Sequence, residues 1–249
     1  MVRGIYTAAM GMLADWFKLD STANNLANVD TVGYKKDIPT FSVYDERHVY
    51  SSLNRKVPIG NLPYSVVVDR VYVDTADGAL QYTGNPLDLA IVGNGYFSVQ
   101  RNNEVLYTRA GNFKLDAEGF IVNADGFRLL DVNNEPIRFE DGFSIDEEGY
   151  VRDQTGNVVS RIAVYGFASQ QSLRKVGYAL FSPTEESGPA VAVEDFRILP
   201  GYVELSNVNA VAELVKMVEL QRHFEITQKI VLAEDEMLAK LFSQLATLR

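Results

Sequence analysis

The chain has no cysteine among its 249 residues, which excludes a disulfide framework, a thiolate metal site and a cysteine redox site. It has only two histidines, His48 and His223, and neither stands with Ser and Asp in a pattern typical of a nucleophilic triad. Basic clusters are missing too, and the net charge is −10, so neither nucleic acid nor an anionic lipid surface is expected as a partner.

Long apolar runs are also missing. No stretch approaches the roughly 18 apolar residues that a membrane span needs, so no transmembrane segment is expected. The first residues carry one charge, Arg3, and lack a uniform apolar block, which argues against a cleavable signal peptide. Hydrophobic residues still make up 47% of the chain, enough to bury one sizeable core or two small ones.

What the chain does contain is an apolar stripe at each end, with a period near 3.5 residues. This spacing keeps one side of a helix facing a partner helix. The N-terminal stripe is Val2, Ile5, Ala9, Met12, Trp16, Leu19, Ala23 and Leu26, and the C-terminal stripe is Met217, Leu220, Phe224, Thr227, Val231, Glu234, Leu238, Leu241, Leu245 and Leu248. An ordinary amphipathic helix at each end of a globular fold is the alternative, but stripes at both ends favour an assembly subunit.

The middle of the chain reads as β structure. A turn signature recurs at 116–120, 123–127 and 146–150, with Asp or Asn first, Gly fourth and an aromatic residue fifth. Asp or Asn opens such a turn by bonding nearby backbone, and Gly adopts the positive φ that follows. The predicted fold class is α+β, with long N- and C-terminal helices pairing as a coiled-coil-like domain around an all-β, hairpin-rich central domain. The expected divisions are an N-terminal helix (1–34), an extended connector with short strands (35–75), a β domain (76–200) and a C-terminal helix (201–249).

Carboxylates are abundant at the expected turns: Glu118, Asp125, Glu140, Asp141, Asp146, Glu147, Glu148 and Asp153. A glycosidase needs two carboxyls across a cleft, one of them in an apolar pocket, but turn chemistry accounts for every residue in this set. Their spacing does not match a calcium-binding EF-hand loop. We therefore expect no catalytic residue, no metal ligand and no cofactor.

Asn24, Asn25 and Asn28 lie close together near the end of the first predicted helix. Asn is a poor helix former, so three in five positions is unusual. Their amides could bond exposed backbone, or each other across an interface, and so fix a register. A frayed helix end rich in turn formers is the equal alternative, and both interpretations stay open.

Several of these segments resemble the axial proteins of the bacterial flagellum, the rod and hook subunits. The matching stretches are 5–12 with 23–35, 83–97 with 107–113, and 201–209 with 217–222 and 233–238. Three separated motifs in the right order cover most of the chain, whereas 40–75 and 160–195 match weakly. Within the family the chain is most similar to the proximal-rod type, because its connector lacks a glycine-rich extension.

The resemblance implies a structural subunit of the basal-body rod, not an enzyme, which assembles helically with copies of itself and other rod subunits to transmit torque. It also implies passage through the flagellar export machinery, without a cleaved signal peptide, to the basal body beyond the inner membrane. Alternatives are a distal-rod or hook-type protein or, from a different class, a secreted cell-wall-active β-domain enzyme with oligomerising helices. The expected subunit-interface residues are Ile5, Met12, Trp16, Leu19, Asn24, Asn25, Leu26, Asn28, Gly33, Tyr34, Met217, Leu220, Phe224, Val231, Leu238, Leu241 and Leu245.

Overall fold

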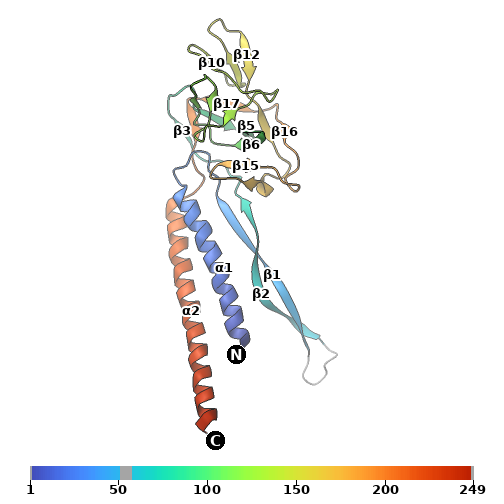
Figure 1. Ribbon diagram of the computed structural model, residues 1–249, viewed down its shortest axis with the longest axis vertical. Coiled ribbons are helices and arrows are strands. Elements are labelled where there is room, and N and C mark those ends of the chain that lie inside the picture. The colour runs from blue at the N-terminus through green and yellow to red at the C-terminus, as the bar shows by residue number, and fades with distance from the viewer. Residues whose placement is uncertain (1, 51–57, 248–249) are drawn as a thin grey trace. The chain divides into compact units, whose positions relative to one another are not determined.

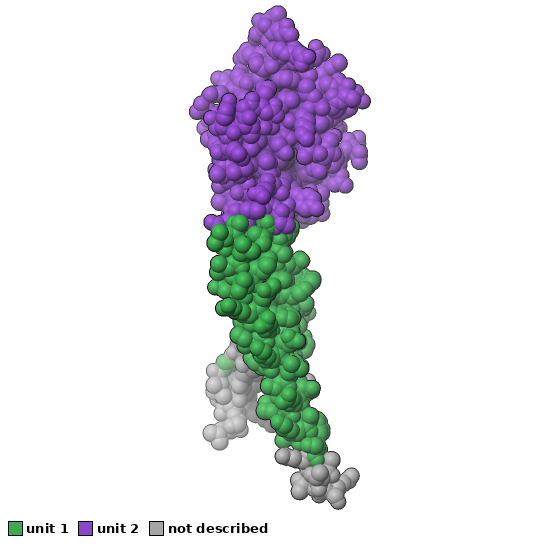
Figure 2. Space-filling view, turned by 90° about the vertical axis from the view of Figure 1, so that its left-hand side faces the viewer, with its two compact units in different colours: residues 1–26, 37–71, 210–249 green, residues 27–36, 72–209 purple. Residues whose placement is uncertain are grey.

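The computed structural model describes residues 2–50 and 58–247, with side chains for residues 4–44, 60 and 66–243. The chain divides into two compact units, shown as a ribbon in Figure 1 and in separate colours in Figure 2. Unit 1 consists of residues 1–26, 37–71 and 210–249, and unit 2 consists of residues 27–36 and 72–209. The fold class is α+β, as the sequence predicted.

Unit 1 contains two long helices, α1 (Val2–Ala27) and α2 (Ala210–Thr247), within the described residues. At 1.5 Å per residue, α1 is about 39 Å long and α2 about 57 Å long. Beyond α1 the chain turns, and the backbone N–H and the hydroxyl of Thr31 both bond to Asn28. Gly33 then takes a φ of 67°, a left-handed conformation that glycine adopts without steric cost.

The rest of unit 1 is a two-stranded ribbon of β1 (Asp37–Tyr50) and β2 (Pro58–Val73). The Thr40 hydroxyl donates to the Arg70 carbonyl between the two strands. The sequence predicted only short strands in this connector, whereas β1 has 14 residues and β2 has 16. Strand length was underestimated because prolines break the pattern, although β-branched residues such as the valines at 66–68 favour extended backbone.

Unit 2 is built from short strands, as the frequent turn signatures predicted. A 3-10 helix, η1 (Gln170–Ser172), lies between β13 and β14. In chain order the strands are β3 (Leu80–Tyr82), β4 (Leu89–Val92), β5 (Tyr96–Arg101), β6 (Glu104–Thr108), β7 (Lys114–Leu115), β8 (Ile121–Val122), β9 (Arg128–Leu129), β10 (Ser144–Ile145), β11 (Tyr150–Arg152), β12 (Val158–Arg161), β13 (Val164–Gly166), β14 (Arg174–Lys175), β15 (Leu180–Ser182), β16 (Val191–Ala192), β17 (Arg197–Pro200) and β18 (Tyr202–Glu204).

The largest sheet of unit 2 has the strand order β14-β15-β6-β5-β9-β8-β7, and β13 pairs with both β5 and β16. Smaller sheets are β10-β11-β12, β17-β4 and β18-β3. The central hairpin of β5 and β6 sets Phe97 opposite Thr108 and Arg101 opposite Glu104. Two of the small sheets, β17-β4 and β18-β3, pair the last strands of the unit with its first, so the unit closes on itself.

β5 lies at the centre of the packing because both of its faces are buried. Phe97 and Val99 face the main apolar core, where the ring of Phe97 packs edge-to-face on Phe113. Tyr96 faces a second apolar cluster that includes Phe167 and Phe181. Successive residues of a strand point to opposite faces, so one strand supplies both clusters.

The recurrent turns have one geometry. In each, Oδ1 of the first residue accepts hydrogen bonds from the backbone N–H groups two and four residues later, as Asp116 does at 2.9 and 2.8 Å. The three predicted turns adopt it, and two more were missed, beginning at Asp131 and Asp153. The Asp131 turn escaped notice because Asn134, with a φ of 61°, takes the place of glycine.

Candidate assembly site

α1 and α2 contact each other within unit 1 (Figure 1). Nδ1 of His223 on α2 is hydrogen-bonded to Oδ2 of Asp15 on α1. The carboxyl group of Glu234 lies against Gly4, where a larger residue would require the Glu234 side chain to shift. From Gly4 to Asp15 the chain advances eleven residues along α1, and from Glu234 to His223 it retreats eleven along α2. The helices are therefore antiparallel, and the contact between His223 and Asp15 was not predicted from the sequence.

The inward face of α2 is the one that the sequence period identified. Between positions 217 and 238, every α2 residue that does not belong to the C-terminal apolar stripe is exposed. The half-buried members are Met217, Leu220, Phe224, Thr227, Val231, Glu234 and Leu238. This periodicity is what a helix packed along one partner requires.

The inward face of α1 was only half identified. Ile5, Met12, Leu19 and Leu26 are half-buried as expected, but Ala9, Trp16 and Ala23 are exposed. The residues one position earlier, Ala8, Asp15 and Thr22, occupy the inward face instead. The prediction failed because it followed hydrophobicity, whereas the buried Asp15 is compensated by its bond to His223.

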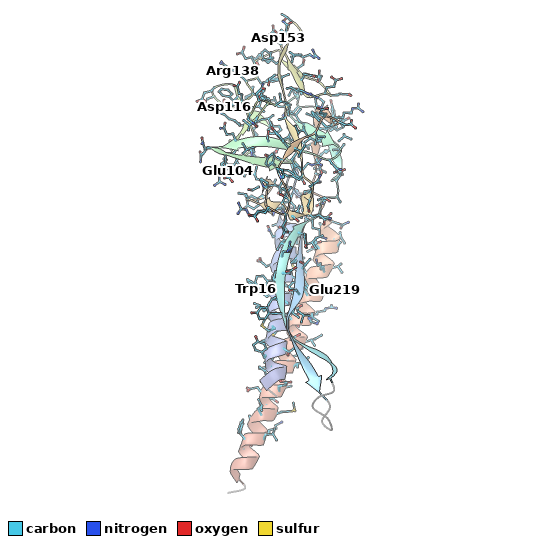
Figure 3. All side chains as sticks on the ribbon, turned by 90° about the vertical axis from the view of Figure 1, so that its right-hand side faces the viewer. Trp16, Glu104, Asp116, Arg138, Asp153 and Glu219 are labelled. Carbon is cyan, nitrogen blue, oxygen red and sulfur yellow. The ribbon has the colours of Figure 1, made fainter. Side chains whose placement is uncertain are left out.

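Apolar side chains therefore remain on the outer surface of unit 1. Trp16 is 52% exposed, packs edge-to-face on Phe17 and is labelled in Figure 3. Beside Trp16, a groove of about 380 Å³ lies between the helices and is lined by Asp15, Trp16, Leu19, Gln221, Phe224 and Glu225. A second cavity of about 190 Å³ separates α1 from β2 and is lined by Met10, Leu13, Ala14, Phe17, Val66, Val67 and Val68.

The C-terminal end of α2 extends past its partner. The register that sets residue 4 opposite residue 234 sets residue 2, the first residue of α1, opposite residue 236. From residue 239 onward α2 therefore runs beyond the N-terminal end of α1, which Figure 1 shows, and we call residues 239–247 the overhang. Leu241 is 42% exposed and Phe242 is 69% exposed on it. The side chain of Leu245, also expected at the interface, lies outside the described residues.

The three asparagines near the end of α1 have different surroundings. Nδ2 of Asn25 donates to the Asp37 carbonyl at 2.9 Å, and the Asp37 N–H donates to Oδ1 of Asn25 at 2.8 Å. Asn25 therefore fastens α1 to the start of β1 inside unit 1 and bonds exposed backbone, one of the two roles considered for it. Asn28 is buried in its turn, whereas Asn24 is exposed, so contact with another subunit remains a prediction for Asn24.

Gly33 and Tyr34 were expected at the subunit interface, but they lie in the interior of unit 2. Tyr34 is 1% exposed, and Nζ of Lys175 lies 3.8 Å above its ring. The Gly33 N–H donates to the Glu204 carbonyl at 2.7 Å, and a Cβ at Gly33 would clash with the backbone of Ala110. Their role in the subunit is internal, because the chain folds back closely on itself here.

A buried ionic cluster in unit 2 was not predicted. Lys35, Arg109 and Glu204 have side chains no more than 2% exposed. Nζ of Lys35 lies 2.6 Å from Oε1 of Glu204, and Nη1 of Arg109 lies 3.3 Å from its Oε2. Charged side chains are usually solvated, so the pattern gave no reason to bury them. A signal did exist, since each of the three residues lies in a different family motif.

Of the carboxylates expected at turns, Asp146 and Asp153 accept turn hydrogen bonds. Glu118 and Glu147 form ion pairs with arginines instead. The backbone N–H of Phe120 is the main group that holds the pKa of Asp116 below its usual range, and the Thr155 hydroxyl does the same for the pKa of Asp153 (both labelled in Figure 3). The Arg197 guanidinium lowers the pKa of Glu147. A general acid needs the opposite shift.

In the stretches 2–50 and 58–247, no group of three His, Cys, Asp or Glu side chains could hold a metal ion. Neither of the described helices combines the length and apolar character that a membrane crossing demands.

The long paired helices around a β-rich middle define a structural protein of the assembly type. Three family models match the chain: "Flagella basal body rod protein" over residues 5–35, "Flagellar hook protein FlgE/F/G D1 domain" over residues 90–178, and "Flagellar basal body rod FlgEFG protein C-terminal" over residues 199–244. These segments contain the first and third motifs of the resemblance and the middle motif from residue 90 onward.

Curated relatives match over nearly the whole chain. The flagellar basal-body rod protein FlgG of Bacillus subtilis is 33% identical over 97% of this chain and 98% of its own length. FlgG of Agrobacterium fabrum is 34% identical over 95% and 97%, and FlgF of Mesorhizobium japonicum is 28% identical over 93% and 92%. The chain therefore belongs to the FlgE/F/G family of flagellar rod and hook proteins. Within that family it is a FlgG-like, non-enzymatic structural component of the basal-body rod, so the enzyme alternative falls.

Proposed function

We propose that the chain packs through unit 1 with copies of itself and with other rod subunits in an open helical array that transmits torque. The exposed apolar surface of unit 1, at Trp16 and on the overhang, carries this proposal. Extended apolar patches on a soluble protein mark surfaces that other molecules cover. Heterologous contacts that do not close produce open helical filaments, the geometry that a rod requires.

The expected interface residues divide into two groups by their exposure. Trp16, Asn24 and Leu241 offer surface directly to a neighbouring subunit. The half-buried residues of the α1–α2 seam keep the two helices paired, so that the outer surfaces are presented together. In this view Ile5, Met12, Leu19 and Leu26 on one helix, and Met217 to Leu238 on the other, support the interface more than they form it.

The placement within the flagellum is part of the same proposal. The connector between Tyr34 and Gly78 lacks a glycine-rich extension, which favours the proximal section of the rod over the distal section, and the chain is short for a hook protein. Export would occur through the flagellar export machinery without a cleaved signal peptide, and delivery would be beyond the inner membrane. The four-part division at residues 34, 75 and 200 also remains a prediction.

An epitope-tagged chain in a strain that lacks the native gene tests this proposal. The tag is expected in purified basal bodies, within the rod, and motility is expected to be restored. Trp16→Asp should abolish rod assembly while the purified variant keeps its helical circular dichroism. Asp20→Asn on an exposed part of the same helix is the matched control and should assemble normally. Recovery of the tag only in the cytoplasm or the culture medium of motile cells would contradict the proposal.

A further inference from the structure

Three segments of unit 2 lie where the chain passes to and from unit 1. Residues 27–36 leave α1 and lead into β1, residues 72–79 follow β2, and residues 203–209 precede α2. The hydrogen bonds and ion pairs among these three segments all join residues of unit 2 to one another.

The three segments are bonded together by backbone and amide groups. The Asp74 N–H donates to the Lys36 carbonyl at 2.8 Å. Oδ1 of Asn207 accepts from the Lys36 N–H at 2.8 Å, and its Nδ2 donates to the carbonyls of Asp74 and Ala76 at 3.2 and 3.0 Å. Asn207 therefore contacts both of the other segments with a single side chain.

The buried charged side chains also bond to the three connecting segments. Nζ of Lys35 donates to the Ala76 carbonyl at 2.8 Å and to Oε1 of Glu204 at 2.6 Å. The Gly78 N–H donates to the same Oε1 at 2.9 Å, so the Glu204 carboxylate bonds to two of the segments at once. Arg109 completes the cluster from the core, since its Nη2 donates to the Gly93 carbonyl at 2.7 Å.

We propose that Lys35, Arg109, Glu204 and Asn207, which we call the tie cluster, hold the three connecting segments together so that they move as one body when the rod turns. Without it, each segment could shift separately, and the load would fall on one backbone connection at a time. Charged pairs removed from water are costly to separate, because separation leaves each ion buried without its counter-charge. This inference rests on the proposed torque-transmitting function.

Glu204→Gln is the first test, because it keeps the side-chain shape and removes the buried charge that both cations face, leaving them only the exposed carboxylate of Asp77 at 3.8 Å. Asn207→Ala is the second, because it removes three side-chain bonds without leaving a buried charge. The matched control is Glu147→Gln, which breaks the exposed pair with Arg197 in the same unit. In the purified full chain, we expect amide exchange at residues 36, 74 and 78 to be roughly a hundredfold faster in Glu204→Gln, and roughly tenfold faster in Asn207→Ala. The core amides of β5 and β6 should keep the wild-type rate.

The decisive readout is rotation under load. Cells carrying either tie variant should assemble basal bodies in wild-type numbers and swim normally in dilute medium, but lose speed severalfold more steeply than the control as viscosity rises. A load response equal to that of Glu147→Gln in both variants would overturn the inference. Loss of rods with a folded Asn207→Ala chain would overturn it too, because the cluster would then serve assembly. If even the wild-type chain is absent from the rod, the proposed function fails instead.

Discussion

Replacing Leu241 by Asp separates assembly from folding. Leu241 lies on the overhang, beyond the reach of α1, and 42% of it is exposed in the isolated chain. Because water already reaches this position, we expect Leu241→Asp to change the stability of the isolated chain by only about 0.5 kcal/mol. In an assembled rod the same position would be covered by a neighbouring subunit, and the cost would be much larger.

The expected loss of assembly free energy follows from the part of the Leu241 side chain that is exposed in the isolated chain. Complete burial of a leucine is worth about 1.5–3 kcal/mol, so covering the exposed two fifths contributes roughly 1 kcal/mol per subunit. Burying an unpaired carboxylate in its place adds several kcal/mol of desolvation penalty. Since about 1.4 kcal/mol is a tenfold change in an equilibrium constant, assembly should weaken by a factor of at least roughly a thousand.

The assay compares two adjacent substitutions. Leu241→Asp is expected to abolish basal-body rods and motility in a complemented deletion strain, while the melting temperature of the β-rich unit is unchanged. Lys240→Asp, at an exposed position outside the stripe, should leave both intact. Equal effects of the two substitutions on motility would refute the stripe register, and a lowered melting temperature in Leu241→Asp would show that the overhang supports the fold.

Three further results are expected. In the dilute chain, hydrogen exchange should be faster in the terminal segments 1–30 and 210–249 than in 76–200; protection of both ends equal to that of 76–200 in a verified monomer would contradict this. A fragment of residues 76–200 should still melt cooperatively, but at a lower temperature than one that includes Glu204, because the buried Arg109 loses its buried counter-ion and keeps only the exposed carboxylate of Asp77, 3.8 Å away; a molten or aggregated product would show that the β structure borrows core from the terminal segments. Burial raises the pKa of Tyr96 to about 12, whereas an unfolded tyrosine ionises near pH 10, so the unfolded state releases a proton first and stability should fall between about pH 10 and 12. Ultraviolet titration of the phenols checks this, and a tyrosine population that ionises fully near pH 10 in the folded protein would contradict it.

The regular features of the fold were predictable because local chemistry determines them. The period of α2 identified its inward face as far as Leu238, and the Asp-to-Gly turn signature identified three of the five turns that share one geometry. The turn at Asp131 uses Asn in place of Gly, and the turn at Asp153 ends without the aromatic residue that the signature required. Where residue type alone fixes the backbone, the sequence was a sufficient guide.

Long-range polar contacts were not predictable in the same way. Asp15, and not Trp16, lies on the inward face of α1. The burial of Asp15 is compensated by its hydrogen bond to His223, which is 208 residues away in the chain. Lys35 and Glu204 are buried for a similar reason, since each is the counter-ion of the other across 169 residues. A hydrophobic pattern ranks residues one at a time, so it cannot detect a burial that depends on a distant partner.

The most direct test of the account is a cryo-EM reconstruction of the purified basal body at side-chain resolution. The account predicts that α1 and α2 run along the rod, with Trp16, Leu241 and Phe242 covered by neighbouring subunits. A rod in which this chain is present but those three side chains still face solvent would contradict the proposed assembly surface.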